Sequence, residues 1–77
     1  MLIPDTLDTA EALIAFMIQV WEPVDWPTYD RFHDARQTAL AFGWHPTDTL
    51  AEGYRVYERG FERVAIDEDG AGIGYAT

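Results

Sequence analysis

The sequence predicts a small single domain of the α+β class, with two or three helices followed by a C-terminal antiparallel β-hairpin or a three-stranded meander. Three observations lead to this prediction. Apolar residues recur at helical spacing in the first half of the chain, and they alternate with period two after Gly60. An Asp69-Gly70 pair then marks a tight turn close to the end of the chain. The 77 residues are enough for one domain, residues 1–77.

The first helix is expected to begin at Asp8, because Asp8 and Glu11 have the N-cap and N3 spacing of a capping box. The following apolar positions share one helix face: Ala10, Leu13, Ile14, Met17 and Trp21. Phe16, Ile18 and Val20 lie off that face, so the helix is apolar nearly all round. Such a helix is central to the fold or is covered by another subunit. We favour the central position and keep a homodimer through this helix as the alternative.

A second helix is predicted over Thr28–Phe42. Asp25 is placed to cap it, and Pro27 suits its first turn because the missing N–H costs nothing there. One face of this helix is apolar, formed by Tyr29, Phe32, Ala35, Ala39 and Phe42. Gly43 favours a helix end, and Trp44 is expected to fold back onto the last turn. We expect Phe32 and Ala39 to be buried.

Residues 48–59 carry mixed signals. Thr49 and Glu52 have capping-box spacing, and apolar residues follow at helical intervals. Against a helix, Gly53 lies inside the segment, and the residues after it favour strands. We expect a helix over 48–59, with a strand over Tyr54–Glu58 as the alternative.

The C-terminal segment is expected to form the hairpin. Val64 and Ile66 alternate with Arg63, Ala65 and Asp67, and Ile73 and Tyr75 can form the return strand. Helices followed by a hairpin superficially fit a winged helix. The turn between the strands reads Asp67-Glu68-Asp69-Gly70, however, and so many acids argue against DNA binding at that position.

Hydrophobic residues make up 48% of the chain and aromatic residues 14%, which predicts a well-formed core. We expect that core to be built around seven aromatic residues: Phe16, Trp21, Trp26, Phe32, Phe42, Trp44 and Phe61. For Trp21 and Trp26, which bracket an acidic loop, a place in the core is preferred to a role as exposed interface anchors.

Charge and missing residue types exclude several functions. The chain has 14 acidic and five basic residues, a net charge of −9, and the acids occur in both halves. Such a surface repels nucleic acid and anionic membranes. There is no cysteine, serine or lysine, so the usual covalent nucleophiles are missing, and we expect no enzyme activity. The first residues lack a secretory signal, and no apolar run is long enough to span a bilayer. A cytoplasmic protein is therefore expected.

No cofactor or metal is expected either. Asp30, His33 and Asp34 fall within one helical turn, but three local ligands make a poor metal site, and a solvated polar face is the preferred interpretation. The acidic turn lacks the later carboxylate of a calcium loop. The glycines between residues 70 and 74 are not followed by a helix that could hold a phosphate.

These observations favour a small acidic protein that binds another protein, namely a basic one that handles nucleic acid. Carboxylates on a rigid scaffold can imitate a phosphate array. The interface is predicted to combine the densest acidic groups: Asp30, Asp34, Asp67, Glu68 and Asp69. In size, charge and lack of catalytic residues the chain resembles phage-encoded inhibitors such as anti-CRISPR and anti-restriction proteins, which implies action in a host cytoplasm. The alternative is a structural or regulatory homo-oligomer from a salt-loving or high-GC organism, whose acidity reflects its environment.

Overall fold

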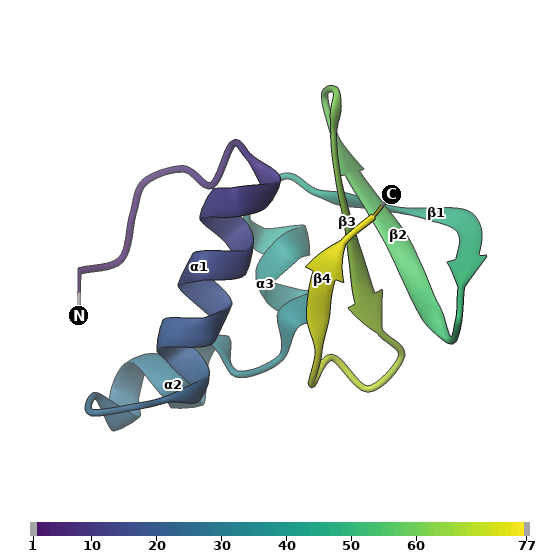
Figure 1. The fold of residues 1–77 in the computed structure, drawn as a ribbon. Coiled ribbons are helices and arrows are strands. Elements are labelled where there is room, and N and C mark those ends of the chain that lie inside the picture. The colour runs from purple at the N-terminus through teal and green to yellow at the C-terminus, as the bar shows by residue number, and fades with distance from the viewer. Residues whose placement is uncertain (1, 77) are drawn as a thin grey trace.

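The helices of this chain precede a four-stranded antiparallel sheet, as the computed structural model of residues 2–76 shows (Figure 1). The elements follow in the order α1 (Ala10–Trp21), α2 (Trp26–Phe32), α3 (Ala35–Ala41), β1 (His45–Ala51), β2 (Tyr54–Arg59), β3 (Glu62–Asp67) and β4 (Ile73–Tyr75). Strand order in the sheet equals sequence order, so the sheet is a simple meander. The α+β class predicted from the sequence is confirmed, and the meander has one strand more than the largest expected.

Helix α1 begins one residue later than predicted. Thr9 is its N-cap, and its hydroxyl accepts a hydrogen bond from the backbone N–H of Ala12 at 3.1 Å. Asp8 instead forms an ion pair with Arg59 at 2.8 Å. A carboxylate from β3, that of Glu62, accepts a hydrogen bond from the N–H of Ala10, which places negative charge at the positive end of the helix.

No helix within residues 2–76 has the length and hydropathy that crossing a membrane requires.

The single helix predicted over Thr28–Phe42 is wrong, because two short helices occupy this segment. Asp25 caps α2 as predicted, accepting hydrogen bonds from the backbone and hydroxyl of Thr28. Asp34, which was expected on a solvated helix face, is the N-cap of α3 and starts a new helix. The hydroxyl of Thr38 donates to the carbonyl of Phe32 at 3.0 Å, so the break leaves that buried carbonyl with a partner.

The end of α3 agrees with the prediction. Gly43 has a φ of +85°, the left-handed conformation that glycine adopts at little cost. The N–H of Trp44 then reaches back to the carbonyl of Ala39 at 2.9 Å, which closes the helix end.

The helix expected over 48–59 is also wrong, and the strand alternative is correct. Ala51 pairs with Tyr54, so Glu52 and Gly53 form a two-residue turn between β1 and β2. Both turn residues have positive φ, 55° and 86°, as a type I′ hairpin turn requires. The glycine that weakened the helix prediction is therefore the residue that makes the turn. Strand β1 is irregular, because its register against β2 shifts between Pro46 and Leu50.

The C-terminal hairpin prediction is confirmed. Strands β3 and β4 pair in the register Val64–Tyr75, Ala65–Gly74 and Ile66–Ile73. The turn between them is closed by a hydrogen bond from the N–H of Gly70 to the carbonyl of Asp67 at 2.8 Å.

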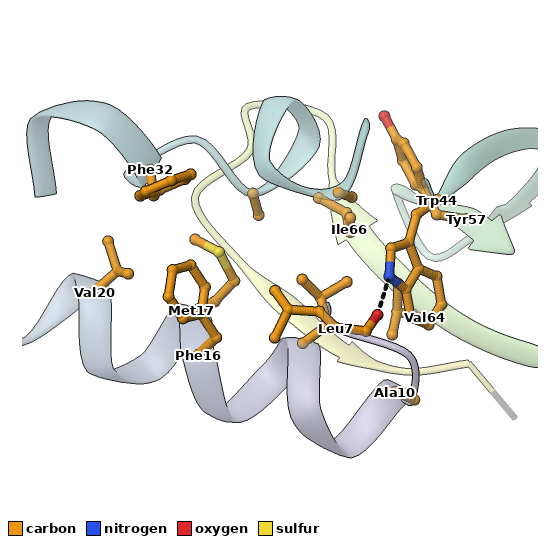
Figure 2. Packing of buried hydrophobic residues seen from close by; sticks show 13 residues of the cluster. Leu7, Ala10, Phe16, Met17, Val20, Phe32, Trp44, Tyr57, Val64 and Ile66 are labelled. Atoms are coloured by element: carbon orange, nitrogen blue, oxygen red, sulfur yellow. Dashed lines mark hydrogen bonds between the residues drawn. The ribbon is translucent and has the colours of Figure 1, made fainter. Parts of the chain in front are cut away.

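The core lies between the helices and one face of the sheet (Figures 1 and 2). In Figure 2 α1 points Phe16, Met17 and Val20 toward Phe32, and the ring centroids of Phe16 and Phe32 lie 5.4 Å apart in an edge-to-face arrangement. Trp44 is fully buried, and its indole N–H donates to the carbonyl of Leu7 at 2.9 Å, which ties the N-terminal segment to the sheet side of the core.

Two of the aromatic residues that the sequence assigned to the core lie outside it. Phe16, Phe32 and Trp44 are buried as expected, but Trp26 is 64% exposed and Phe61 is fully exposed. Phe61 is the second residue of the two-residue turn between β2 and β3, so it lies at the end of the hairpin and outside the core. Trp26 lies on the first turn of α2, on a different face from the buried Phe32.

Candidate functional site

The turn between β3 and β4 carries three of the five acids predicted to bind a partner: Asp67, Glu68 and Asp69. We call these three residues the acidic tip. The turn is not free in solvent, because the carbonyl of Gly70 accepts a hydrogen bond from the N–H of Ala35 at 2.9 Å. Gly70 is buried there, and a Cβ at this position would overlap the carboxylate of Asp34. The acidic tip is therefore fixed against the start of α3.

Asp34, the fourth predicted residue, lies beside the tip but is committed to holding α3. Its carboxylate accepts from the backbone N–H of Arg36 at 2.8 Å and of Gln37 at 3.4 Å. It also pairs with the Arg36 guanidinium at 3.1 Å, and only 24% of its side chain is exposed. Burial by itself raises the pKa of Asp34, but the hydrogen bonds from Arg36 and Gln37 outweigh it and hold the pKa below its ordinary value.

Two arginines also lie at this site, which the sequence did not reveal. Arg36 faces Asp34, and its pKa is raised by the hydrogen bond to that carboxylate, with a smaller contribution from Asp69. Arg55 approaches Glu68, with 3.9 Å between Nη2 and Oε1, and donates to the carbonyl of Thr47 at 2.8 Å. The acids of the tip are therefore partly balanced by two guanidinium groups that come from α3 and β2.

The hydroxyl of Tyr57 interacts with the charges of this cluster. Burial raises the pKa of its hydroxyl, against the opposing effect of the charges on Arg36 and Arg55. Tyr57 belongs to the hydrophobic core, so the charged cluster borders the core at this residue.

Asp30, the fifth predicted residue, stands apart from the other four. It is exposed on α2, one helix before Asp34. Within residues 2–76, Asp30, Asp67 and Asp69 form no ion pair at 4 Å or less. These three carboxylates and the weakly paired Glu68 are the acids of the predicted set that remain available to a partner.

The sequence assigned Trp26 to the core, but its exposed ring begins a row of rings that continues over Tyr29 to His33, the C-cap of α2. The Trp26 ring meets Tyr29 edge to face at 5.5 Å, and Tyr29 stacks on His33 at 5.4 Å. The spacing of these residues, i, i+3 and i+7, places them along one side of α2, and this is the signal that could have found them. Tyr29 is half-buried and packs against the core, whereas Trp26 and His33 are exposed. Val24, just before the helix, is fully exposed beside this row in the sequence.

The geometry gives no support to metal chemistry at Asp30, His33 and Asp34. The Nδ1 atom of His33 lies 3.2 Å from the carbonyl of Tyr29 and 3.3 Å from that of Asp30. Asp34 points to the start of α3 instead. Throughout the part of the chain that the structure describes, no three acids or imidazoles come together in an arrangement that could hold a metal ion.

Fold and site together define a two-layer α+β protein with a fixed, partly balanced cluster of acids at one corner. Comparison with protein-family models, with curated protein sequences and with solved structures finds no significant match.

Proposed function

We propose that this chain binds a basic protein, of the kind that handles nucleic acid, and blocks it by placing carboxylates where phosphates would lie. The observation that supports this most strongly is the hydrogen bond between Ala35 and Gly70, which fixes the acidic tip on α3. Acids held in place before binding lose little conformational freedom when they meet a basic surface, so less free energy opposes association.

The overall charge supports the same proposal. A net charge of −9 attracts a basic surface over a distance of about one Debye length, roughly 8–10 Å at physiological salt. Such steering raises the association rate more than it raises the affinity. Asp30 is exposed on α2, and Glu68 and Asp69 are exposed in the turn before β4. Arg36 pairs with Asp34, and Arg55 approaches Glu68.

Trp26 supplies what acids alone lack, an apolar group that can anchor an interface. Its exposed ring lies on the same helix as Asp30. Tryptophan is enriched among residues that dominate binding energy, and its face attracts arginine and lysine side chains. We infer that the partner surface covers the acidic tip and reaches α2.

The proposal is tested by capture and competition. The chain is immobilised, a partner is captured from a lysate of the natural host, and the purified partner is bound to a labelled nucleic acid. We expect the chain to displace that nucleic acid in proportion to its concentration. A captured partner that keeps its nucleic acid at saturating concentrations of the chain would contradict the blocking mechanism.

The alternative explanation of the acidity, adaptation to salt, has its own signature. A halophilic fold loses stability when salt is removed, because its surface charges then repel one another unscreened. The binding proposed here weakens instead when salt is added. Melting temperature and affinity measured across the same salt series separate the two explanations.

A further inference from the structure

The two edges of the sheet differ in how they are protected against pairing with another strand. Edge strand β1 carries three of the features that block such pairing. Pro46 has no N–H to donate, the register is irregular between Pro46 and Leu50, and Asp48 places a charge in the middle of the strand. Its outer edge is therefore a poor template for another strand.

Edge strand β4 has none of these three features. Residues 71–76 contain no charged residue and no proline, and the register against β3 is continuous. The hydrogen bond from the N–H of Asp67 to the carbonyl of Gly72 shows which residues bond to β3. Because bonded and non-bonded pairs alternate in an antiparallel ladder, the backbone groups of Ile73 and Tyr75 point to the outer edge. No fifth strand covers them within residues 2–76.

Two shallow hollows flank the end of β4. One, of about 510 Å³, lies over Val56, Ala65 and Gly74, on the face of the sheet away from the core. The other, of about 460 Å³, lies between the start of α1 and the exposed Phe61. Both are lined by Arg63, Tyr75 and Ala76. Since successive side chains of a strand point to opposite faces, a strand added beside β4 would place its side chains alternately toward the two hollows.

The charges around this edge favour a basic occupant. Three acids line the two hollows, Glu11, Glu52 and Glu62, against the single base Arg63. The acidic tip adds three more acids just before β4. A second copy of the chain would bring another net charge of −9 to the same place, whereas an extended segment rich in lysine or arginine is attracted to it.

We propose that the outer edge of β4 is a docking site for an extended basic segment of a partner protein, which adds a fifth strand to the sheet. This inference rests on the proposed function for the choice of a basic partner and identifies how that partner is held. Backbone hydrogen bonds to Ile73 and Tyr75 hold the segment, and its alternate side chains occupy the two hollows.

The experiment uses the full chain labelled with ¹⁵N and a synthetic nine-residue peptide in which lysine and valine alternate, blocked at both ends. Amide hydrogen exchange is measured by NMR with and without the peptide. We expect the amides of Ile73 and Tyr75 to exchange at least tenfold more slowly with the peptide present. The amide of Gly74, which already faces β3, serves as the internal control and should change much less.

Two matched changes separate backbone pairing from charge attraction. Tyr75→Pro removes the outward N–H without touching the β3 ladder, and Tyr75→Ala removes only the side chain. We expect the proline variant to bind the peptide at least tenfold more weakly than the alanine variant. A peptide N-methylated on alternate residues keeps its charge, leaves the protein unaltered and should bind at least tenfold more weakly as well.

Three results would overturn the inference. The exchange of Ile73 and Tyr75 is unchanged by the peptide, or the N-methylated peptide binds as well as the unmodified one. The third such result is that the amides of Ile73 and Tyr75 are already protected from exchange without peptide and that the chain sediments as a dimer. The β4 edge would then be covered by a second copy of the chain. None of these results touches the proposed function, which is tested separately by the competition with nucleic acid.

Discussion

Gly70 is the residue at which the acidic tip meets α3, so its substitution tests the central contact of the site. Its φ is +72°, a conformation that disfavours any side chain, and its carbonyl accepts the hydrogen bond from Ala35. A Cβ would overlap the Asp34 carboxylate and lie 3.2 Å from Nε of Arg36. Gly70→Ala must therefore strain the backbone and also displace the N-cap of α3.

The two costs can be added from general magnitudes. A left-handed conformation costs an alanine about 1–2 kcal/mol. Loss of an N-cap costs a further 0.5–2 kcal/mol, roughly, in free energy of unfolding. We expect Gly70→Ala to lower the free energy of unfolding by about 1.5–4 kcal/mol, a large part of the stability of a small domain. Gly53→Ala is the matched control, because Gly53 also has a positive φ, +86°, but nothing lies within 4 Å of its Cβ position. Gly53→Ala should therefore lower the free energy of unfolding only by the cost of the left-handed conformation, about 1–2 kcal/mol.

Urea unfolding followed by tryptophan fluorescence measures both variants, since the fully buried Trp44 becomes exposed on unfolding. A double-mutant cycle with Asp34→Ala isolates the clash. With Asp34 truncated, the cost of Gly70→Ala should fall to about that of Gly53→Ala. The reasoning is refuted when Gly70→Ala costs no more than Gly53→Ala, or when Asp34→Ala leaves its cost unchanged.

Three further outcomes are expected. Phe32→Ala should lower stability by about 3–5 kcal/mol in the same urea assay, whereas Phe61→Ala, at a fully exposed position, should change it by less than about 0.5 kcal/mol. Because the pKa of Asp34 is lowered in the folded state, this residue contributes stability above its unfolded pKa of about 3.9, and the contribution is lost as the pH falls through the folded pKa. In Asp34→Asn the free energy of unfolding should therefore depend less on pH in this range. Ile18 is the large apolar residue exposed on α1, at 49%. If the chain forms a dimer through α1, Ile18→Glu should convert the dimer to a folded monomer, as measured by sedimentation. A wild-type monomer at high micromolar concentration excludes this dimer.

Local signals in the sequence predicted those parts of the fold that local chemistry determines. Gly43 and Trp44 end α3 as expected, because only the residues next to the helix end are involved. The turn at Asp69 and Gly70 was found for the same reason. A tight turn needs a residue that tolerates positive φ, and a glycine in the sequence indicates such a position.

The errors arose where one residue type has two uses. An aspartate inside an apolar repeat can lie on a solvated face or start a new helix, and Asp34 does the second. Glu52 and Gly53 lack the Asn or Asp that commonly precedes glycine in a type I′ turn, so the local sequence predicts a helix where β1 and β2 form a hairpin. In both places contacts made by the folded chain decide between the uses.

The candidate site was predicted only in part. The sequence placed the acids in two groups, but it could not show that Gly70 would bring Asp34 to the acidic tip. Nor could it show that Arg36 and Arg55, which are distant in sequence from Asp69, would lie among these acids. Both facts depend on how α3 packs beside the sheet, and tertiary contacts of this kind leave no periodic signal in a single sequence.

The association rate with a captured basic partner tests the central claim most directly. In one variant the four available acids become amides, as Asp30→Asn, Asp67→Asn, Glu68→Gln and Asp69→Asn. In the matched control the same change is made at four exposed acids that line neither hollow beside β4: Asp5, Glu22, Asp48 and Glu58. Both variants have a net charge of −5 instead of −9, so a general effect of charge is the same for both. We expect the first variant to associate at least tenfold more slowly than the control at low salt, and with a weaker dependence on salt. Equal rates for the two variants would contradict the claim that the acidic tip and α2 form the binding surface.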